Sequence, residues 1–215
     1  MSGSRGFYRD DCRSGDRLAR EWTRIAGADN LSVEWQADIG KFAYTITRVG
    51  VQASHIWRWM ASPSMPCFDV YYLSKKNMQA PNQNRPCLSG LMFDTIDTNN
   101  YSLVGGSDQL YFGRFFGGVY YYKLWVVSLT NDVWYAVRVR RNQKDVRLKI
   151  WQYGTAEPDW QYTQSTAPGA SNENPVRFQV RGGSTFGIVD YLYAVGDYCK
   201  IADLRITPIR KVGGP

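Results

Sequence analysis

Residues 134–160 carry the most regular pattern in the chain, an alternation of aliphatic and basic side chains. The aliphatic phase holds Val137, Val139, Val146, Leu148 and Ile150, and the basic phase holds Arg138, Arg140, Arg147 and Lys149. Successive side chains of a β-strand point to opposite faces of the sheet. The pattern therefore predicts a half-buried β-hairpin with an apolar inner face and a basic outer face.

The register of this hairpin depends on where the chain turns. With a turn at residues 141–144, Arg140 lies opposite Asp145. Arg138 then lies opposite Arg147, and the other face is apolar throughout. Two arginines that face each other repel and so destabilise the pairing. We therefore expect a carboxylate on a neighbouring strand or a bound anion close by. We expect a solvated basic face with local ion pairs.

Short strand-like segments separated by turn residues occupy the rest of the chain. The predicted strands are residues 31–37, 42–48, 55–60, 68–74, 88–94, 101–104, 109–116, 119–128, 134–140, 145–151, 177–180, 185–189 and 199–207. Aromatic residues make up 15% of the sequence, and no stretch has the apolar spacing of a core helix. The pattern predicts an all-β fold, a two-sheet sandwich or barrel with few, short helices.

A length of 215 residues suits one substantial β domain. We predict an N-terminal arm or first edge strand at residues 1–14, the sandwich at 15–208 and a C-terminal tail at 209–215. The first residues lack the apolar segment of a signal peptide, and no apolar run is long enough to span a membrane. The net charge is +7, but the cations are spread along the chain, which argues against a nucleic-acid partner.

The sequence contains few residues that could support metal, redox or nucleophilic chemistry. The cysteines, Cys12, Cys67, Cys87 and Cys199, stand singly, without the spacing of a zinc site or redox pair. With His55 as the single histidine, we predict no metal site and no cofactor. The thiols are expected to be reduced and partly buried, while a Cys67–Cys87 disulfide and a bound calcium ion are left open.

Glycoside hydrolysis needs two carboxyl groups about 5–5.5 Å apart in retaining enzymes. The pairs nearest to each other in sequence are Glu157 with Asp159 and Asp94 with Asp97. Both pairs stand at turn-like positions, and we interpret them as turn residues. Enzymatic activity is therefore not expected.

Aromatic rings are the best candidates for contact with a sugar or with another protein, because flat rings stack on sugars and fill interfaces. The candidates on presumed exposed phases are Trp57, Trp59, Tyr120, Tyr122, Trp151 and Trp160. Each is also a candidate for the core of the sandwich. Tyr71 and Tyr72 are adjacent aromatics that must point to opposite faces of a strand, so one of them is exposed or covered by another chain.

The order of features in residues 134–160 resembles the concanavalin A-like, laminin-G-like jelly roll of phage tail and baseplate proteins and of secreted bacterial carbohydrate-associated proteins. The similarity lies in a Trp-Tyr that opens a strand, the basic hairpin, Lys149-Ile150-Trp151, and Glu157-Pro158-Asp159-Trp160. Tyr8-Arg9-Asp10-Asp11-Cys12 is similar to the family's opening strand, and Ile201-Ala202-Asp203-Leu204-Arg205-Ile206 to its closing strand. Residues 50–128 carry no matching motif.

The resemblance implies a two-sheet antiparallel jelly-roll sandwich whose first and last strands pair. It also implies a non-enzymatic virion component of a phage tail or baseplate, assembled in the host cytoplasm. Such a component docks on other virion proteins in an oligomeric assembly and contacts host-surface glycan. The alternative is a free carbohydrate-binding protein or glycan hydrolase of the same fold.

Overall fold

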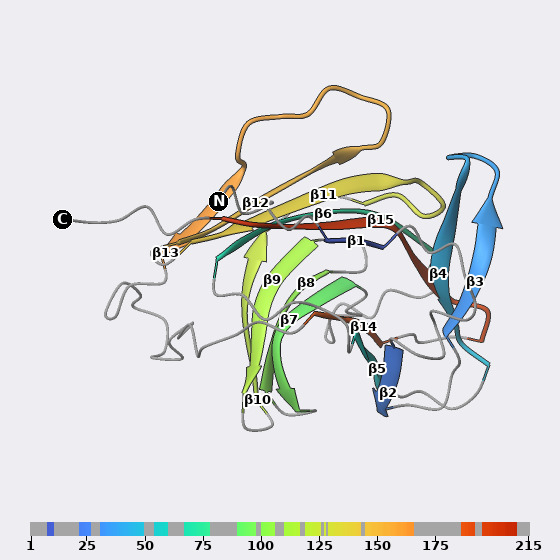
Figure 1. Ribbon diagram of the computed structural model, residues 1–215, viewed down its shortest axis with the longest axis horizontal. Coiled ribbons are helices and arrows are strands. Elements are labelled where there is room, and N and C mark those ends of the chain that lie inside the picture. Colours follow the sequence, from blue (N-terminus) through green and yellow to red (C-terminus); the bar gives the residue numbers. More distant parts are fainter. Residues whose placement is uncertain are drawn as a thin grey trace, which may run out of the picture.

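The computed structural model describes residues 8–10, 22–26, 31–49, 54–59, 67–77, 90–97, 100–105, 110–116, 119–125, 127, 129–142, 145–165, 186–191 and 195–209. The regular elements in these ranges are all β-strands, so the few short helices that we expected are not found there. Figure 1 shows the strands in two layers, one sheet above the other. The all-β, two-sheet antiparallel prediction is confirmed.

Sheet A is the upper layer of Figure 1 and has eight strands. In spatial order it contains β13 (Tyr162–Ser165), β12 (Asp145–Gln152), β11 (Tyr135–Arg141), β6 (Phe68–Asn77), β15 (Tyr198–Pro208), β4 (Lys41–Thr47) and β3 (Leu31–Gln36), with β1 (Tyr8–Asp10) paired to β15. Several neighbouring strands in this sheet come from distant parts of the sequence, namely β11 beside β6, β6 beside β15 and β15 beside β4. The sheet therefore gathers side chains that no local motif connects.

Sheet B is the lower layer and has seven strands. Its spatial order is β10 (Val119–Trp125), β9 (Leu110–Phe116), β8 (Asn100–Gly105), β7 (Gly90–Asp97), β14 (Gly187–Tyr191), β5 (Ser54–Trp59) and β2 (Trp22–Ala26). Most side chains of this sheet lie outside the described part of the chain. β2 and β13 were not among the predicted strands, and predicted strand 177–180 lies outside the described residues.

The first and last strands pair as expected. β1 runs antiparallel to β15, with Tyr8 opposite Ile206 and Asp10 opposite Leu204. β15 also lies between β6 and β4 in sheet A, so the first strand of the chain pairs with a central strand of this sheet. Part of the predicted N-terminal arm is thus an edge strand of the sandwich.

The predicted register of the β11–β12 hairpin is wrong by two residues. Arg140 lies opposite Arg147, and Arg138 lies opposite Lys149. The connection is shorter than predicted because Arg141 continues the strand and pairs with Val146 instead of entering the turn. A shift of two keeps every side chain on its predicted face.

Arg141 also corrects the expectation of a wholly apolar inner face. Its side chain belongs to the same phase as Val137 and Val139 and is only 1% exposed. The inner face of the hairpin is therefore apolar over most of its length and ends in a buried arginine.

The main core lies between the sheets and joins them through aromatic contacts. Trp22 of β2 meets Tyr44 of β4 edge to face, with ring centroids 5.0 Å apart. Phe68 of β6 meets Phe186, which precedes β14, at the same distance. Fully burying a large apolar side chain contributes about 1.5–3 kcal/mol, and this layer contains many such side chains.

A second, smaller apolar cluster lies on the outer face of sheet A. Its buried members are Ala43, Leu73, Trp134, Ala136 and Ala202, with Ile39, Tyr71 and Trp151 packed against them. Three of these residues are alanines, whose small side chains leave room for aromatic rings to lie against the sheet. The outer face is therefore not the simple solvated surface that the alternation predicts.

Both described cysteines are buried and free. Cys67 and Cys199 are 4% and 1% exposed and form no disulfide. Cys12 and Cys87 lie outside the described residues, and so does the predicted C-terminal tail beyond Ile209.

Candidate functional site

Asp69 of β6 is the carboxylate around which the basic face of the hairpin is organised. Arg138 donates from Nε to Asp69 Oδ1 at 2.8 Å and from Nη2 to Oδ2 at 3.1 Å. Arg140 donates to Oδ2 from Nε at 2.8 Å and from Nη2 at 2.5 Å. A carboxylate on a neighbouring strand is thus present as predicted, but the arginines that face each other are Arg140 and Arg147, not Arg138 and Arg147.

Glu157 supplies a second carboxylate from the loop between β12 and β13. Its Oε1 lies 2.7 Å from Lys149 Nζ and accepts a hydrogen bond from Arg138 Nη1 at 2.9 Å. The hydrogen bond from Lys149, opposed by partial burial and reinforced by Arg138, holds the pKa of Glu157 below 4.5. Glu157 is therefore ionised at neutral pH.

The loop that carries Glu157 is fixed by its own backbone contacts. The N–H of Tyr153 donates to the carbonyl of Trp134 at 2.8 Å. Thr155 closes a turn by donating from its N–H and its hydroxyl to the carbonyl of Gln152, at 3.2 Å and 2.8 Å. Gly154, with φ 91°, adopts a conformation that favours glycine. Figure 1 shows the loop arching over the outer face of sheet A.

Trp160, near the end of the same loop, packs against the basic side chains. Lys149 Nζ lies 4.7 Å from the centroid of its ring, and the guanidinium carbon of Arg140 lies 5.1 Å from it. Such cation–π contacts hold charged groups in place. Trp160 therefore fixes the cations that hold the two carboxylates.

Arg205 of β15 belongs to a second group of charges. β15 has a bulge between Ala202 and Arg205, and Asp203 within it has φ 51°, which is uncommon except for glycine, asparagine and aspartate. Arg205 donates through Nε and Nη2 to the two oxygens of Asp203, and Lys41 Nζ lies 3.3 Å from Asp203 Oδ2. Burial raises the pKa of Asp203, but the bonds from Arg205 and Lys41 outweigh it and hold the pKa below 3.8.

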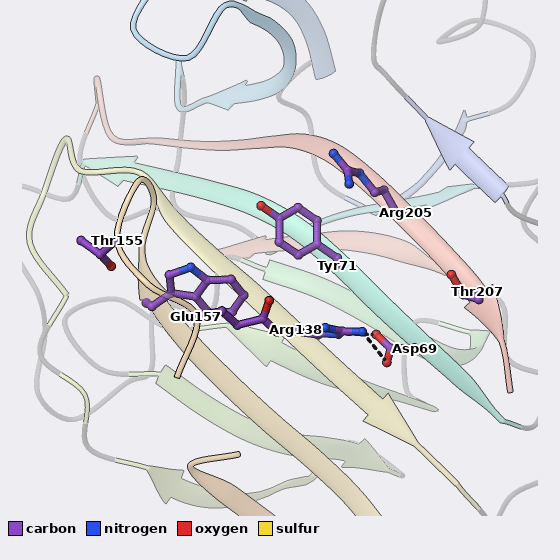
Figure 2. Close-up of a pocket in the computed structure, with 8 residues that line it drawn as sticks. Asp69, Tyr71, Arg138, Thr155, Glu157, Arg205 and Thr207 are labelled. Atoms are coloured by element: carbon purple, nitrogen blue, oxygen red, sulfur yellow. Dashed lines mark hydrogen bonds and ion pairs between the residues drawn. The ribbon is translucent and has the colours of Figure 1, made fainter. Parts of the chain in front are cut away.

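Between these groups lies a pocket of about 480 Å³ on the outer face of sheet A. It is lined by Asp69, Tyr71, Arg138, Trp151, Thr155, Glu157, Arg205 and Thr207, which come from β6, β11, β12, β15 and the loop after β12 (Figure 2). The rings of Tyr71 and Trp151 are 6.1 Å apart between centroids. The guanidinium of Arg205 lies 5.1 Å from the centroid of the Tyr71 ring.

Several polar groups of the pocket have no hydrogen-bond partner among the described residues. They are the hydroxyls of Tyr71 and Thr207, the indole N–H of Trp151, Arg205 Nη1 and Glu157 Oε2. The pocket therefore offers both donors and acceptors beside two aromatic rings. A ligand that can donate and accept at many positions would match this set.

The structure divides the predicted contact residues between the two sheets. Trp151 and Arg138 line the pocket, and Arg140, Lys149 and Trp160 form the network beside it. Arg147 lies opposite Arg140 in the hairpin but does not line the pocket.

The other four predicted aromatics belong to sheet B. Trp57 and Trp59 lie in β5, and Tyr120 and Tyr122 lie in β10. The side chains of these four residues are outside the described part of the chain. Of the six aromatics, only Trp151 and Trp160 can therefore be placed relative to the pocket.

The sequence does not predict most of the residues that line the pocket. Glu157 is predicted to be a turn residue, but it lies beyond the turn, in the loop before β13, and holds two cations. Tyr71 was identified as one of two adjacent aromatics with opposite orientations, and it is the one that faces outward: Tyr72 is buried in the core. Nothing local marks Asp69 as a site residue, and Arg205 is noted only as part of the closing-strand motif.

Two negative findings concern the described ranges only. No group of three His, Cys, Asp or Glu side chains there is arranged to hold a metal ion. That part of the chain also contains no helix with the length and apolar character needed to cross a bilayer.

Comparison with known proteins identifies the fold. No family model matches the chain, and no curated protein is significantly similar to it. A solved structure of a Bacillus subtilis protein of unknown function with a galectin-like fold superposes with a TM-score of 0.61 at 12% identity, over 95% of this chain and 96% of that one. The carbohydrate-binding module CBM66 from Bacillus subtilis superposes with a TM-score of 0.55 at 9% identity, over 87% and 95%.

A third similar structure is the exoplasmic/lumenal domain of VIP36, in a form bound to Ca²⁺ and Man3GlcNAc. It superposes with a TM-score of 0.58 at 10% identity, over 91% of this chain and 88% of that domain. At such low identity these likenesses show the fold alone. The chain is a jelly-roll β-sandwich of the kind found in galectin-like proteins and carbohydrate-binding modules.

Proposed function

We propose that this protein is a non-enzymatic carbohydrate-binding protein that holds its glycan in the outer pocket of sheet A. The observation that carries the proposal is the composition of the pocket, in which two aromatic rings lie beside fixed carboxylates and arginines. Each sugar hydroxyl both donates and accepts, and the faces of a pyranose ring are apolar enough to stack on Trp or Tyr. The pocket supplies hydrogen-bond donors and acceptors for the hydroxyls, and the rings of Tyr71 and Trp151 for the faces of the sugar.

Preorganisation supports the same proposal. Asp69 and Glu157 each bind two cations, so neither carboxylate needs to reorient when a hydroxyl approaches. A site whose polar groups are already held in place loses less conformational entropy on binding. The similar fold of a named carbohydrate-binding module adds support, although the low identity carries no residue over.

The charge states of the pocket favour binding over hydrolysis. A glycosidase needs one carboxyl group that stays protonated to act as a general acid, which requires a raised pKa. The pKa of Glu157 is lowered instead, because Lys149 and Arg138 stabilise its ionised form. We therefore propose that the pocket binds glycan and does not cleave it.

A glycan array tests this function, with wild type compared with Trp151→Ala and Trp35→Ala. Trp151 lines the pocket, whereas Trp35 is a 55% exposed tryptophan of β3 and lies outside it. We expect wild type and Trp35→Ala to bind the same glycans and Trp151→Ala to lose roughly two- to tenfold in affinity, since a stacking contact with a ring contributes about 0.5–1.5 kcal/mol. An array that is blank for wild type would overturn the proposal.

A finer role as a phage tail or baseplate component in the virion rests on the sequence resemblance. The exposed Trp35 favours a docking surface at this end of sheet A, apart from the pocket. Tail or baseplate genes beside this gene, together with co-purification of the protein with particles, would support this role. A protein that stays monomeric and is absent from purified particles would contradict it.

A further inference from the structure

The outer face of sheet A carries more positive than negative charge around the pocket. The ion pairs there join Lys41, Arg138, Arg140, Lys149 and Arg205 to Asp69, Glu157 and Asp203. The cations in this network exceed the carboxylates by two. A neutral sugar would leave this excess in place, whereas an anionic group would reduce it.

Arg205 is the cation best placed to meet such a group. Its Nε and Nη2 are used by Asp203, but Nη1 has no hydrogen-bond partner among the described residues and the side chain is 40% exposed at the pocket wall. Arg138, in contrast, donates from all three of its nitrogens to Asp69 and Glu157. Nη1 of Arg205 is therefore open to hydrogen bonding by a ligand in the pocket.

The backbone of β15 is shaped to hold Arg205 in this position. Asp203 and Arg205 are two positions apart in β15 and lie on the same face of the sheet, so that one carboxylate holds one guanidinium through two bonds. The bulge requires a positive φ at Asp203, a non-glycine residue. Tyr71 supports the other side of the guanidinium. Bulges and uncommon backbone conformations of this type are concentrated at functional sites.

We propose that the pocket recognises an acidic glycan, with a carboxylate or sulfate group of the sugar bound by Arg205. This inference rests on the proposed carbohydrate-binding function and names its substrate class. The anionic group accepts hydrogen bonds from Arg205, while Tyr71 and Trp151 contact the sugar ring. Hydroxyls of the glycan bind Glu157 and the other open groups of the pocket.

The decisive ligand pair is an oligouronide and its carboxyl-reduced derivative, which differ in charge and share their linkages. The array used above, with neutral, carboxylated and sulfated glycans, selects the oligosaccharide, and calorimetric titration measures both forms. The variants are Arg205→Gln, Arg205→Lys and Lys200→Gln. Lys200→Gln removes one positive charge from the same sheet outside the pocket and is the control for net charge.

Wild type and Lys200→Gln should prefer the acidic form by roughly ten- to a hundredfold, as expected for hydrogen bonds between charged groups. Arg205→Gln should lose this preference while still binding the reduced form, and Arg205→Lys should keep part of it. Urea unfolding of each variant establishes that the fold is intact.

The remaining outcomes separate the two proposals. Equal binding of both forms by wild type, or an acidic preference that survives in Arg205→Gln, would overturn the acidic-glycan inference and leave the carbohydrate-binding function standing. Binding of no glycan of any class would overturn the function itself.

Discussion

Neighbouring residues of β11 and β12 face two different environments. Val139 and Leu148 point into the core between the sheets, while Arg140 and Lys149 point to the outer face. The inner side chains gain from leaving water, a gain that depends little on direction. The outer ones depend on partners in fixed places, namely Asp69 on β6 and Glu157 on a loop. The comparison indicates that the inner face sets stability and that the outer face positions chemical groups.

The largest effect on stability should come from the inner face. Leu148→Ala removes a fully buried side chain of the main core and should lower the free energy of unfolding by about 2–5 kcal/mol. Gln152→Ala, at an exposed position of the same strand, should change it by less than about 0.5 kcal/mol. Urea unfolding followed by tryptophan fluorescence measures both. Equal losses in the two variants would contradict the division between the faces.

An intermediate effect is expected at the bulge of β15, and it should depend on pH. Asparagine tolerates the positive φ of Asp203, so Asp203→Asn removes the charge and leaves the backbone in place. At neutral pH it should cost about 1–3 kcal/mol, as expected for hydrogen bonds to a charged group.

The pKa of Asp203 is lower in the folded protein than 3.8, so its ion pairs stabilise the fold above that pH and are lost as the pH falls through the folded value. The unfolding free energies of wild type and Asp203→Asn should therefore converge in acid. Urea unfolding between neutral pH and strong acid measures the difference. A constant gap across this range would show that Asp203 acts through packing and not through its charge.

The same comparison explains which features the sequence could predict. The alternation along β11 and β12 assigns each side chain to a face from local information alone, and the structure agrees. The register was wrong because residues 141–144 are all polar, and nothing local shows that Arg141 extends the strand. The kind of partner for the arginines could be predicted from their repulsion, but its identity could not.

The pocket could not be predicted as a whole from the local sequence. Tyr71, Arg138 and Arg205 come from three strands that are far apart in the chain and adjacent in sheet A. The bulge at Asp203 interrupts a segment that reads as one continuous strand. Pairing between distant strands and backbone irregularities are both set by the assembled sheet, so a single sequence indicates the pocket only through Trp151, Arg138 and the Tyr71-Tyr72 pair.

The smallest effect should be found at the other end of the outer face. Lys200 Nζ lies 3.0 Å from Glu34 Oε2, but Glu34 is 42% exposed, whereas Asp69 is 10% exposed. Water screens an exposed pair, so a double-mutant cycle of Glu34→Gln and Lys200→Met should give a coupling energy of about 0.2–1 kcal/mol that shrinks as salt is added. The same cycle with Asp69→Asn and Arg138→Met should give a larger coupling that depends less on salt. If the two cycles gave equal energies, burial would not distinguish the charges of the pocket from those of an ordinary sheet surface.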